Sequence, residues 1–192
     1  MGAENIMNIT ETNIPGCYEI RPKISTDNRG RFIKTFQENL FRSNGLLDRF
    51  AEEFHSESRK GVVRGLHFQI PPMAQAKVVY CVSGAVLDAV VDLRVGSPTF
   101  GRFATFALTD RDGTILYIPE GLAHGFCVLS DSAIMMYKVT AEYTPSLDAG
   151  ILWDSAGIPW PVSDPVLSER DRAFPRLSDF TSPFTHRGPE EN

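Results

Sequence analysis

The middle of the chain, from Gly61 to about Tyr143, alternates short apolar runs with turn-forming residues. The runs are rich in Val, Ile, Leu, Phe and Tyr, and Gly, Pro, Ser and Asp separate them, a pattern typical of strands joined by turns. Turns recur at roughly 8–12 residues, which favours an all-β sandwich or barrel. The six clearest runs predict strands at residues 77–82, 86–93, 102–108, 114–118, 125–129 and 133–140.

The first fifty residues carry weaker patterns. Short alternation interrupted by prolines predicts an N-terminal arm or edge strands over residues 1–25. A turn at residues 27–30 precedes an alternating, strand-like run at residues 31–36. Residues 38–50 have the best helical pattern, which predicts two short helical turns broken at Asn44-Gly45.

The C-terminal part, from residue 148, is rich in Pro, Ser and Asp but keeps scattered large apolar residues. Such a segment is expected to lie over the body of the protein rather than to form a second core. We therefore predict a single domain, with an N-terminal arm at residues 1–25, a core at 26–147 and a C-terminal extension packing on the core at 148–192.

Composition places the chain among ordinary globular proteins of one domain. Its 192 residues are 42% hydrophobic and 22% charged, which suffices for a substantial core. The net charge of −5 disfavours a nucleic-acid-binding protein and attachment to anionic membranes, because both need a basic face. A negatively charged small ligand would need a local basic pocket.

The N-terminus lacks a basic segment followed by an apolar run, so we expect no secretory signal. No apolar stretch approaches the length of a membrane span. Cys17, Cys81 and Cys127 are far apart and odd in number, and we interpret Cys81 and Cys127, which lie in apolar runs, as buried small hydrophobes. The expected compartment is the cytoplasm.

Residues 60–69 place Arg64 and His67 between apolar neighbours on a predicted strand. Side chains alternate along a strand, so Arg64 and His67 share a face only if the chain bulges near Gly65. Polar groups in such a run are costly to bury unless they are paired or act on a ligand. This segment is therefore a candidate binding or catalytic strand.

Several motifs together resemble the dTDP-4-dehydrorhamnose 3,5-epimerase family, over residues from about 18 to 184. The resemblance rests on their order and spacing more than on any one of them. They are Asp27-x-Arg-Gly-x-Phe32, Arg64-Gly-Leu-His-Phe-Gln69, Gln75-x-Lys77, Gly84-x-x-x-Asp88, Asp92-x-Arg-x-x-Ser-Pro-Thr-Phe-Gly101, Tyr117-Ile-Pro-x-Gly-x-Ala-His-Gly-Phe126, Tyr137-Lys-x-Thr, Ile158-x-Trp-Pro161 and Leu167-Ser-x-x-Asp171.

The resemblance implies an all-β cupin jelly roll with short helices and an N-terminal arm, assembled as a homodimer. It implies a nucleotide-diphosphate-sugar substrate and neither a cofactor nor a metal ion. Such enzymes invert carbons C3 and C5 beside the C4 carbonyl of a 4-keto-6-deoxyhexose, which requires a base, an acid on the opposite face and a cation for the enolate. By resemblance, His67 is the base, Asp171 orients it, Tyr137 is the acid and Lys77 lies near the carbonyl oxygen.

Other matching positions imply substrate contacts. Arg29 and Arg64 match residues that bind the diphosphate, which suits the guanidinium fork. His124 matches a second active-site histidine, and Asp88 is interpreted either as a supporting partner or as an inward-facing aspartate with satisfied hydrogen bonds. Gln69 belongs to the Arg64 motif, and Tyr143 is expected to line the sugar or nucleotide pocket.

The chain departs from the family pattern near the expected nucleobase end. Lys34 stands where the family usually has Glu, Glu52 stands near a usual Gln, and Phe54-His-Ser56 replaces Asn-His-Ser. Thymine and cytosine differ in their hydrogen-bond donors and acceptors, so these exchanges raise the hypothesis of a CDP-sugar or another nucleotide sugar as substrate.

Four alternatives remain open at this point. The enzyme could invert a single carbon, or act as a ketoisomerase that abstracts a similar proton. A metal-dependent cupin would need a second histidine close to His67, and Phe-Gln-Ile-Pro-Pro follows instead. A non-catalytic protein that binds nucleotide sugars would retain the pocket without turnover.

Overall fold

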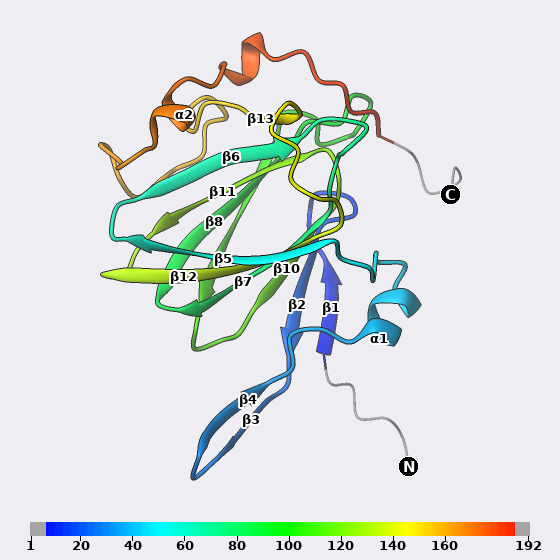
Figure 1. Ribbon diagram of the computed structural model, residues 1–192, viewed down its shortest axis with the longest axis vertical. Helices are drawn as coiled ribbons and strands as arrows, with labels where there is room; N and C mark the ends of the chain where they lie inside the picture. Colours follow the sequence, from blue (N-terminus) through cyan, green and yellow to red (C-terminus); the bar gives the residue numbers. More distant parts are fainter. Residues whose placement is uncertain (1–6, 187–192) are drawn as a thin grey trace.

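The computed structural model describes residues 7–186, which form two packed antiparallel sheets with short helices at the periphery (Figure 1). The six-stranded sheet has the order β1-β2-β10-β7-β12-β5, and the five-stranded sheet has the order β13-β6-β11-β8-β9. The prediction of an all-β sandwich or barrel is confirmed. None of the described helices is long and apolar enough to cross a membrane.

The strands of the six-stranded sheet are β1 (Met7–Glu11), β2 (Tyr18–Pro22), β10 (Ile115–Ile118), β7 (Lys77–Ser83), β12 (Ser132–Val139) and β5 (Glu52–Arg59). Those of the five-stranded sheet are β13 (Asp148–Gly150), β6 (Val63–Gln69), β11 (Leu122–Val128), β8 (Ala85–Asp92) and β9 (Phe103–Thr109). The remaining elements are β3 (Ile24–Asp27), β4 (Gly30–Ile33), α1 (Glu38–Ser43), α2 (Glu169–Arg172) and the 3₁₀ turn η1 (Leu177–Asp179).

All six predicted strands are present, with ends that differ by a few residues from the predicted ones. The predicted turn at residues 27–30 joins β3 to β4, whose strand ends at Ile33 rather than at residue 36. The second helical turn predicted over residues 46–50 is wrong. The helix ends at Ser43 because Gly45 takes a left-handed conformation (φ 71°), after which Leu46 turns inward and is buried.

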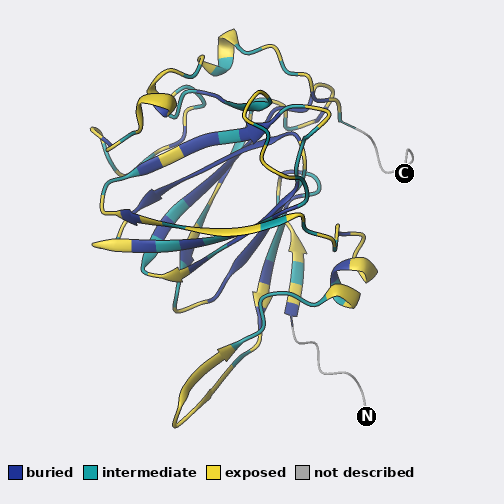
Figure 2. Cartoon of the chain, viewed as in Figure 1, coloured by how far each residue is buried: buried dark blue, intermediate teal, exposed yellow. Residues whose placement is uncertain are grey.

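The main core lies between the two sheets, whose inner faces are largely buried (Figure 2) and are apolar outside one polar cavity. Representative buried residues are Val79, Leu116 and Met135 from one sheet and Phe126 and Leu108 from the other. Alternation explains this arrangement, since every second side chain of a strand faces the opposite sheet. A second cluster joins β6 to residues 151–184, so the C-terminal segment packs on the outer face of the five-stranded sheet (Figure 1).

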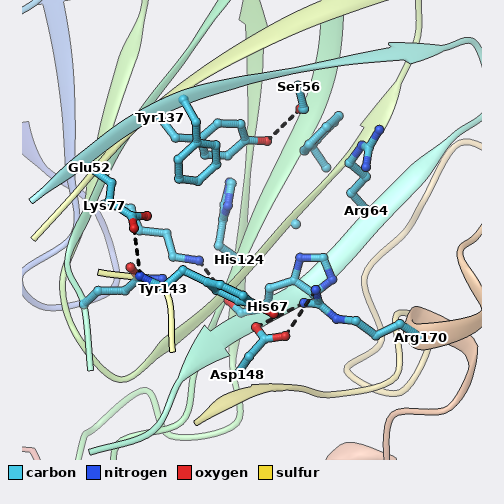
Figure 3. Close-up of a pocket in the computed structure, with 14 residues that line it drawn as sticks. Glu52, Ser56, Arg64, His67, Lys77, His124, Tyr137, Tyr143, Asp148 and Arg170 are labelled. Carbon is cyan, nitrogen blue, oxygen red and sulfur yellow. Dashed lines mark hydrogen bonds and ion pairs between the residues drawn. The ribbon is translucent and has the colours of Figure 1, made fainter. Parts of the chain in front are cut away.

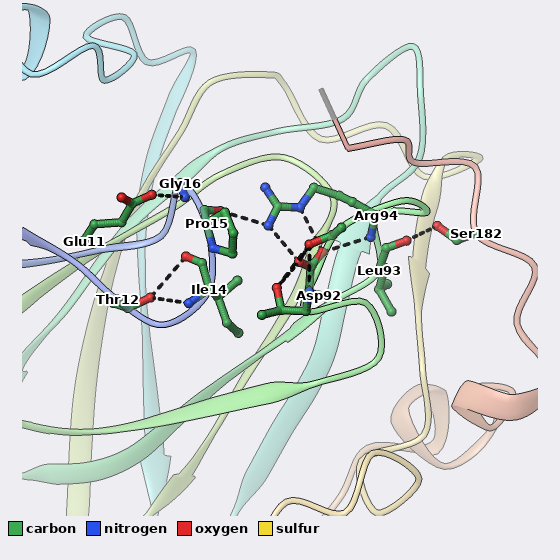
Figure 4. Close-up of polar contacts among 11 residues, drawn as sticks. Glu11, Thr12, Ile14, Pro15, Gly16, Asp92, Leu93, Arg94 and Ser182 are labelled. Carbon is green, nitrogen blue, oxygen red and sulfur yellow. Dashed lines mark hydrogen bonds and ion pairs between the residues drawn. The ribbon is translucent and has the colours of Figure 1, made fainter. Parts of the chain in front are cut away.

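A buried ion pair and a neighbouring hydrogen bond hold the β1–β2 connection and the C-terminal segment to this body (Figure 4). Arg94 donates to both carboxylate oxygens of Asp92 at 2.8 Å, and its Nη2 also donates to the Pro15 carbonyl at 2.9 Å. The hydroxyl of Ser182 donates to the Leu93 carbonyl. The β1–β2 connection and the C-terminal segment are thus held at the same end of β8, next to the turn that follows it.

Candidate active site

One cavity of about 510 Å³ opens between the two sheets and is lined by a group of polar side chains (Figure 3). Its walls come from β5, β7 and β12 of one sheet, from β6 and β11 of the other, and from residues beyond β12. It is lined by Glu52, Phe54, Ser56, Arg64, His67, Gln75, Lys77, His124, Gly125, Phe126, Tyr137, Tyr143, Asp148 and Arg170.

A bulge in β6 brings Arg64 and His67 into the same cavity. His67 pairs with His124 while Arg64 pairs with Phe126, so three steps along β6 match two along β11. Gly65 allows this approach, because a Cβ there would lie 2.6 Å from the Gly125 Cα, and its φ of 123° disfavours other residues. The extra residue in β6 interrupts the alternation of its side chains, so Arg64 and His67 face the same cavity. The sequence predicted a shared face only if the chain bulged near Gly65.

His67 is hydrogen-bonded to a buried carboxylate behind it. Its Nε2 lies 2.8 Å from Asp171 Oδ1, and the Gly65 amide donates to Asp171 Oδ2 at 3.1 Å. Burial lowers the pKa of His67, outweighing the opposing effect of Asp171, which favours the neutral imidazole. Although burial opposes ionisation of Asp171, hydrogen bonds from His67 and Gly65 lower its pKa. An ionised Asp171 accepts a hydrogen bond from Nε2–H, which keeps the proton on Nε2 and leaves a lone pair on Nδ1.

Tyr137 comes from β12, in the sheet opposite to His67, and is 8% exposed. Its hydroxyl lies 3.4 Å from the Ser56 hydroxyl. Burial raises the pKa of Tyr137, so the phenol keeps its proton at neutral pH. Figure 3 shows Tyr137 and His67 on different sides of the cavity, with His124 between them.

Lys77, at the start of β7, is buried with its ammonium in the cavity. Its Nζ donates to the His67 carbonyl at 3.3 Å. Burial lowers the pKa of Lys77 to about 8, against the attraction of Asp148. Lys77 therefore remains largely cationic at neutral pH, and because it is buried its charge is screened less by solvent and acts strongly on an anion.

A second histidine–aspartate pair lies deeper in the cavity. His124 Nε2 is 2.8 Å from Asp88 Oδ2, and both side chains are buried. Asp88 is therefore the supporting partner of His124, one of the two interpretations left open above. Burial raises the pKa of Asp88, and its Oδ1 has no hydrogen-bond partner among the described residues.

Nine of the twelve predicted site residues lie in or directly behind this cavity. Eight of them line it: His67, Lys77, Tyr137, Arg64, His124, Tyr143, Glu52 and Ser56. Asp171 supports His67 from behind. Gln69 instead holds the segment after β12, because its amide nitrogen donates to the Glu142 carbonyl and its oxygen accepts from the Thr144 amide.

Arg29 and Lys34 do not reach the cavity of this chain. Arg29 lies at the tip of the β3–β4 hairpin, which projects from the body (Figure 1), and its exposed guanidinium pairs with Asp27 at 2.5 Å. Lys34 follows β4 directly. Neither residue reaches the cavity of its own chain because the hairpin points away from the sheets, and their role as substrate contacts stays a prediction.

Several residues that line the cavity were not singled out from the sequence. Asp148 and Arg170 form an ion pair at 3.2 Å beside Lys77 and His67. Arg170 directly precedes Asp171 in the Leu167 motif, so that motif carried a signal for it. Asp148 had no such signal, since its place depends on the pairing of β13 with β6.

The arrangement places an imidazole and a phenol on opposing walls with a lysine ammonium between the sheets, and these groups can serve as base, acid and cation. A ligand between the walls would present one face to the imidazole and the other to the phenol. Proton removal beside a carbonyl needs a site for the developing oxyanion, and Lys77 supplies a buried positive charge there. Arg64 and Arg170 add the basic character that an anionic ligand requires in an acidic protein.

Comparison with known proteins agrees with this chemistry. Residues 11–179 match the family model described as dTDP-4-dehydrorhamnose 3,5-epimerase. The chain is 45% identical over 168 residues to the dTDP-4-dehydrorhamnose 3,5-epimerase of Shigella flexneri, covering 86% of this chain and 93% of that protein.

Solved structures share the fold as well. A crystal structure of the Legionella pneumophila epimerase in complex with dTDP-4-keto-L-rhamnose superposes with a TM-score of 0.89 at 38% identity, covering 94% of this chain and all of that one. A 3'-monoepimerase from Streptomyces bikiniensis in complex with dTDP-quinovose gives 0.83 at 36% identity, covering 87% and 86%. The cupin jelly-roll prediction is thereby confirmed, and the chain belongs to the dTDP-4-dehydrorhamnose 3,5-epimerase family.

Proposed function

We propose that this epimerase acts on a dTDP-4-keto-6-deoxyhexose and inverts C3 and C5 through enolate intermediates, in deoxysugar biosynthesis. The observation that carries the assignment of roles is the placement of His67 and Tyr137 on opposing sheets across one cavity. Relatives named for this reaction, and one solved with a dTDP-sugar, support the substrate. The C4 carbonyl accepts the electron pair, so the proposed reaction needs no cofactor.

In the proposed mechanism, His67 Nδ1 takes the proton from the carbon next to the carbonyl, and the C–H electrons move to the C4 oxygen. Asp171 holds the Nε2 proton in place and stabilises the imidazolium that forms. Lys77 stabilises the enolate oxygen. The enolate electrons return to the carbon as Tyr137 gives its proton to the opposite face, which inverts it. Tyr137 then recovers a proton from solvent, and His67 releases to solvent the proton that it took.

We assign three further cavity residues to the nucleotide diphosphate. Arg64 and Arg170 provide guanidinium groups for its phosphates, and the exposed ring of Tyr143 provides a surface for a planar base. Glu52 Oε1 accepts a hydrogen bond from the Tyr143 backbone amide at 3.0 Å, so this oxygen already has a partner within the protein. This hydrogen bond makes it less plausible that Glu52 selects a different nucleobase. Competition between dTDP and CDP for binding tests the hypothesis of a different base.

Deuterium incorporation tests the reaction directly. The enzyme is incubated in heavy water with dTDP-4-keto-6-deoxyglucose and, separately, with the CDP analogue, and C3 and C5 are followed by NMR and mass spectrometry. Two deuterons and two inverted centres are expected with the dTDP-sugar. One inverted centre would indicate a monoepimerase, turnover of the CDP-sugar alone would overturn the nucleotide assignment, and binding without exchange would overturn the catalytic function.

We further propose that the active form is a homodimer in which the β3–β4 hairpin places Arg29 in the partner's cavity. Phe32 of the hairpin is a large apolar side chain that is 65% exposed, which an interface would bury, and the neighbouring Arg29 side chain is 84% exposed. A dimer would also explain why residues matching substrate contacts lie far from this chain's own cavity. Lys34, directly after the hairpin, would lie near the same interface.

Mixed dimers test whether Arg29 acts in the cavity of its own chain or in that of the partner. Arg29→Ala and His67→Ala are each expected to be nearly inactive. Subunits mixed and allowed to exchange should regain activity, because one hybrid site combines the intact His67 of one chain with the intact Arg29 of the other. Absence of recovery, with hybrid formation verified by mass spectrometry, would show that Arg29 does not act across an interface.

A further inference from the structure

The ring of Tyr137 is covered on one side by Phe54. The two ring centroids are 4.9 Å apart and the ring planes differ by 15°, which is a stacked arrangement. Phe54 is still 45% exposed and lines the cavity.

The register between β5 and β12 places Phe54 beside Tyr137. Tyr137 of β12 lies directly opposite Phe54 on the neighbouring β5, and cross-strand pairs project to the same face of a sheet. Glu52, Phe54 and Ser56 alternate along β5, and all three line the cavity. The exposed His55 between them points to the other face.

The hydroxyl of Tyr137 is weakly held by comparison. Its described hydrogen-bond partner, the Ser56 hydroxyl, is 3.4 Å away, beyond the usual length for two hydroxyl groups. His124 contacts the ring through its edge, with centroids 6.2 Å apart. The flat contact with Phe54 is thus the closest ring contact of Tyr137, and it fixes the plane in which the hydroxyl lies.

We propose that Phe54 is a positioning residue for the inverting proton transfer, because it holds the Tyr137 ring at the angle from which its hydroxyl reaches the substrate. This inference rests on the proposed function, in which Tyr137 is the acid. Phe54 contributes to the return of the proton and not to its removal, since removal belongs to His67 on the opposite sheet.

The two halves of the reaction are measurable separately in heavy water. His67 alone breaks the C–H bond and, after exchanging its proton with solvent, returns a deuteron to the same face, which labels the substrate without inversion. Inversion requires a proton or deuteron from Tyr137 on the other face. The ratio of inversion to exchange without inversion therefore reports on the acid, and it does not change when the fraction of folded enzyme falls.

Phe54→Ala is expected to lower inversion by about three- to tenfold, the range that an aromatic pair contributes, while exchange without inversion is kept. Phe54→Tyr should restore the ratio because the stack is retained. Phe54→Leu, which keeps apolar volume without a flat ring, should resemble Phe54→Ala and serves if the alanine variant does not fold. His55→Ala is the matched control on the opposite face of β5 and should leave both rates unchanged.

Two variants give the reference values. Tyr137→Phe should lose inversion and keep exchange without inversion, and His67→Ala should lose both processes. Equal loss of inversion and exchange in Phe54→Ala and Phe54→Leu, or an unchanged ratio in both, would overturn the proposal while leaving the epimerase function intact. A native enzyme that shows neither process would instead overturn the proposed function, and this inference with it.

Discussion

Replacement of Asp171 by asparagine tests the tautomer on which the base depends. Both carboxylate oxygens are engaged, Oδ1 with His67 Nε2 at 2.8 Å and Oδ2 with the Gly65 amide at 3.1 Å. In Asp171→Asn, the single carbonyl oxygen is expected to stay on the Gly65 N–H, which can only donate. The amide NH₂ then faces Nε2 and forces the imidazole proton onto Nδ1.

This substitution is expected to lower kcat by about 10³–10⁴-fold, the loss seen when an orienting aspartate is replaced and its histidine takes the wrong tautomer. The largest of these values corresponds to about 5.4 kcal/mol of transition-state stabilisation. Binding of dTDP should change little, because Asp171 lies behind the cavity and does not line it. Both proton exchange and inversion should fall together, since each begins with His67.

The assay combines steady-state kinetics, titration calorimetry with dTDP and deuterium exchange. Asp164→Asn, an exposed carboxylate in the same C-terminal segment, is the matched control and should retain native kcat. The reasoning would be refuted if Asp171→Asn kept kcat within about tenfold of the native enzyme while folding normally. In that case the pair would have only a structural role.

Three further predictions follow from the site and its supports. The pKa of Lys77 is lowered to about 8 by burial, so kcat should fall as pH rises through that value, and Lys77→Arg, whose guanidinium stays charged, should move this loss to higher pH. An unchanged alkaline limb in a pH–rate profile would contradict the role. Gly65→Ala should cost at least about 2 kcal/mol in the free energy of unfolding, measured in urea, because its Cβ would lie 2.6 Å from the Gly125 Cα; native stability would contradict this geometry. Gln69→Ala should raise KM more than it lowers kcat, because Gln69 holds the segment that carries Tyr143; kinetics showing a fall in kcat alone would place Gln69 closer to the chemistry.

The sequence predicted best those parts that depend on local pattern. Strands with apolar inner faces, such as β7 and β8, were identified because alternation or continuous apolar runs are visible in one segment. β5 was missed, because Glu52–Arg59 is almost entirely polar, as its place at the sheet edge and beside a polar cavity requires. Propensity alone does not predict a strand whose inner face lines a ligand site.

The site was predicted unevenly for a similar reason. His67, Lys77 and Tyr137 belong to motifs on strands, and the structure brings them to one cavity. The position of Arg29 depends on where a projecting hairpin points, and that of Asp148 on the pairing of distant strands. Neither the direction of a hairpin nor a pairing across 80 residues leaves a periodic trace in the sequence.

The two histidine–aspartate pairs in the cavity have the same 2.8 Å geometry, yet their surroundings favour only one as the base. Asp171 receives a second hydrogen bond, from the Gly65 amide, and its pKa is lowered; it is therefore a full carboxylate that can stabilise an imidazolium. Burial raises the pKa of Asp88, whose Oδ1 has no partner among the described residues. A carboxyl group that resists ionisation gives little support to a histidine gaining a proton. These differences support the proposal that His67, rather than His124, is the base.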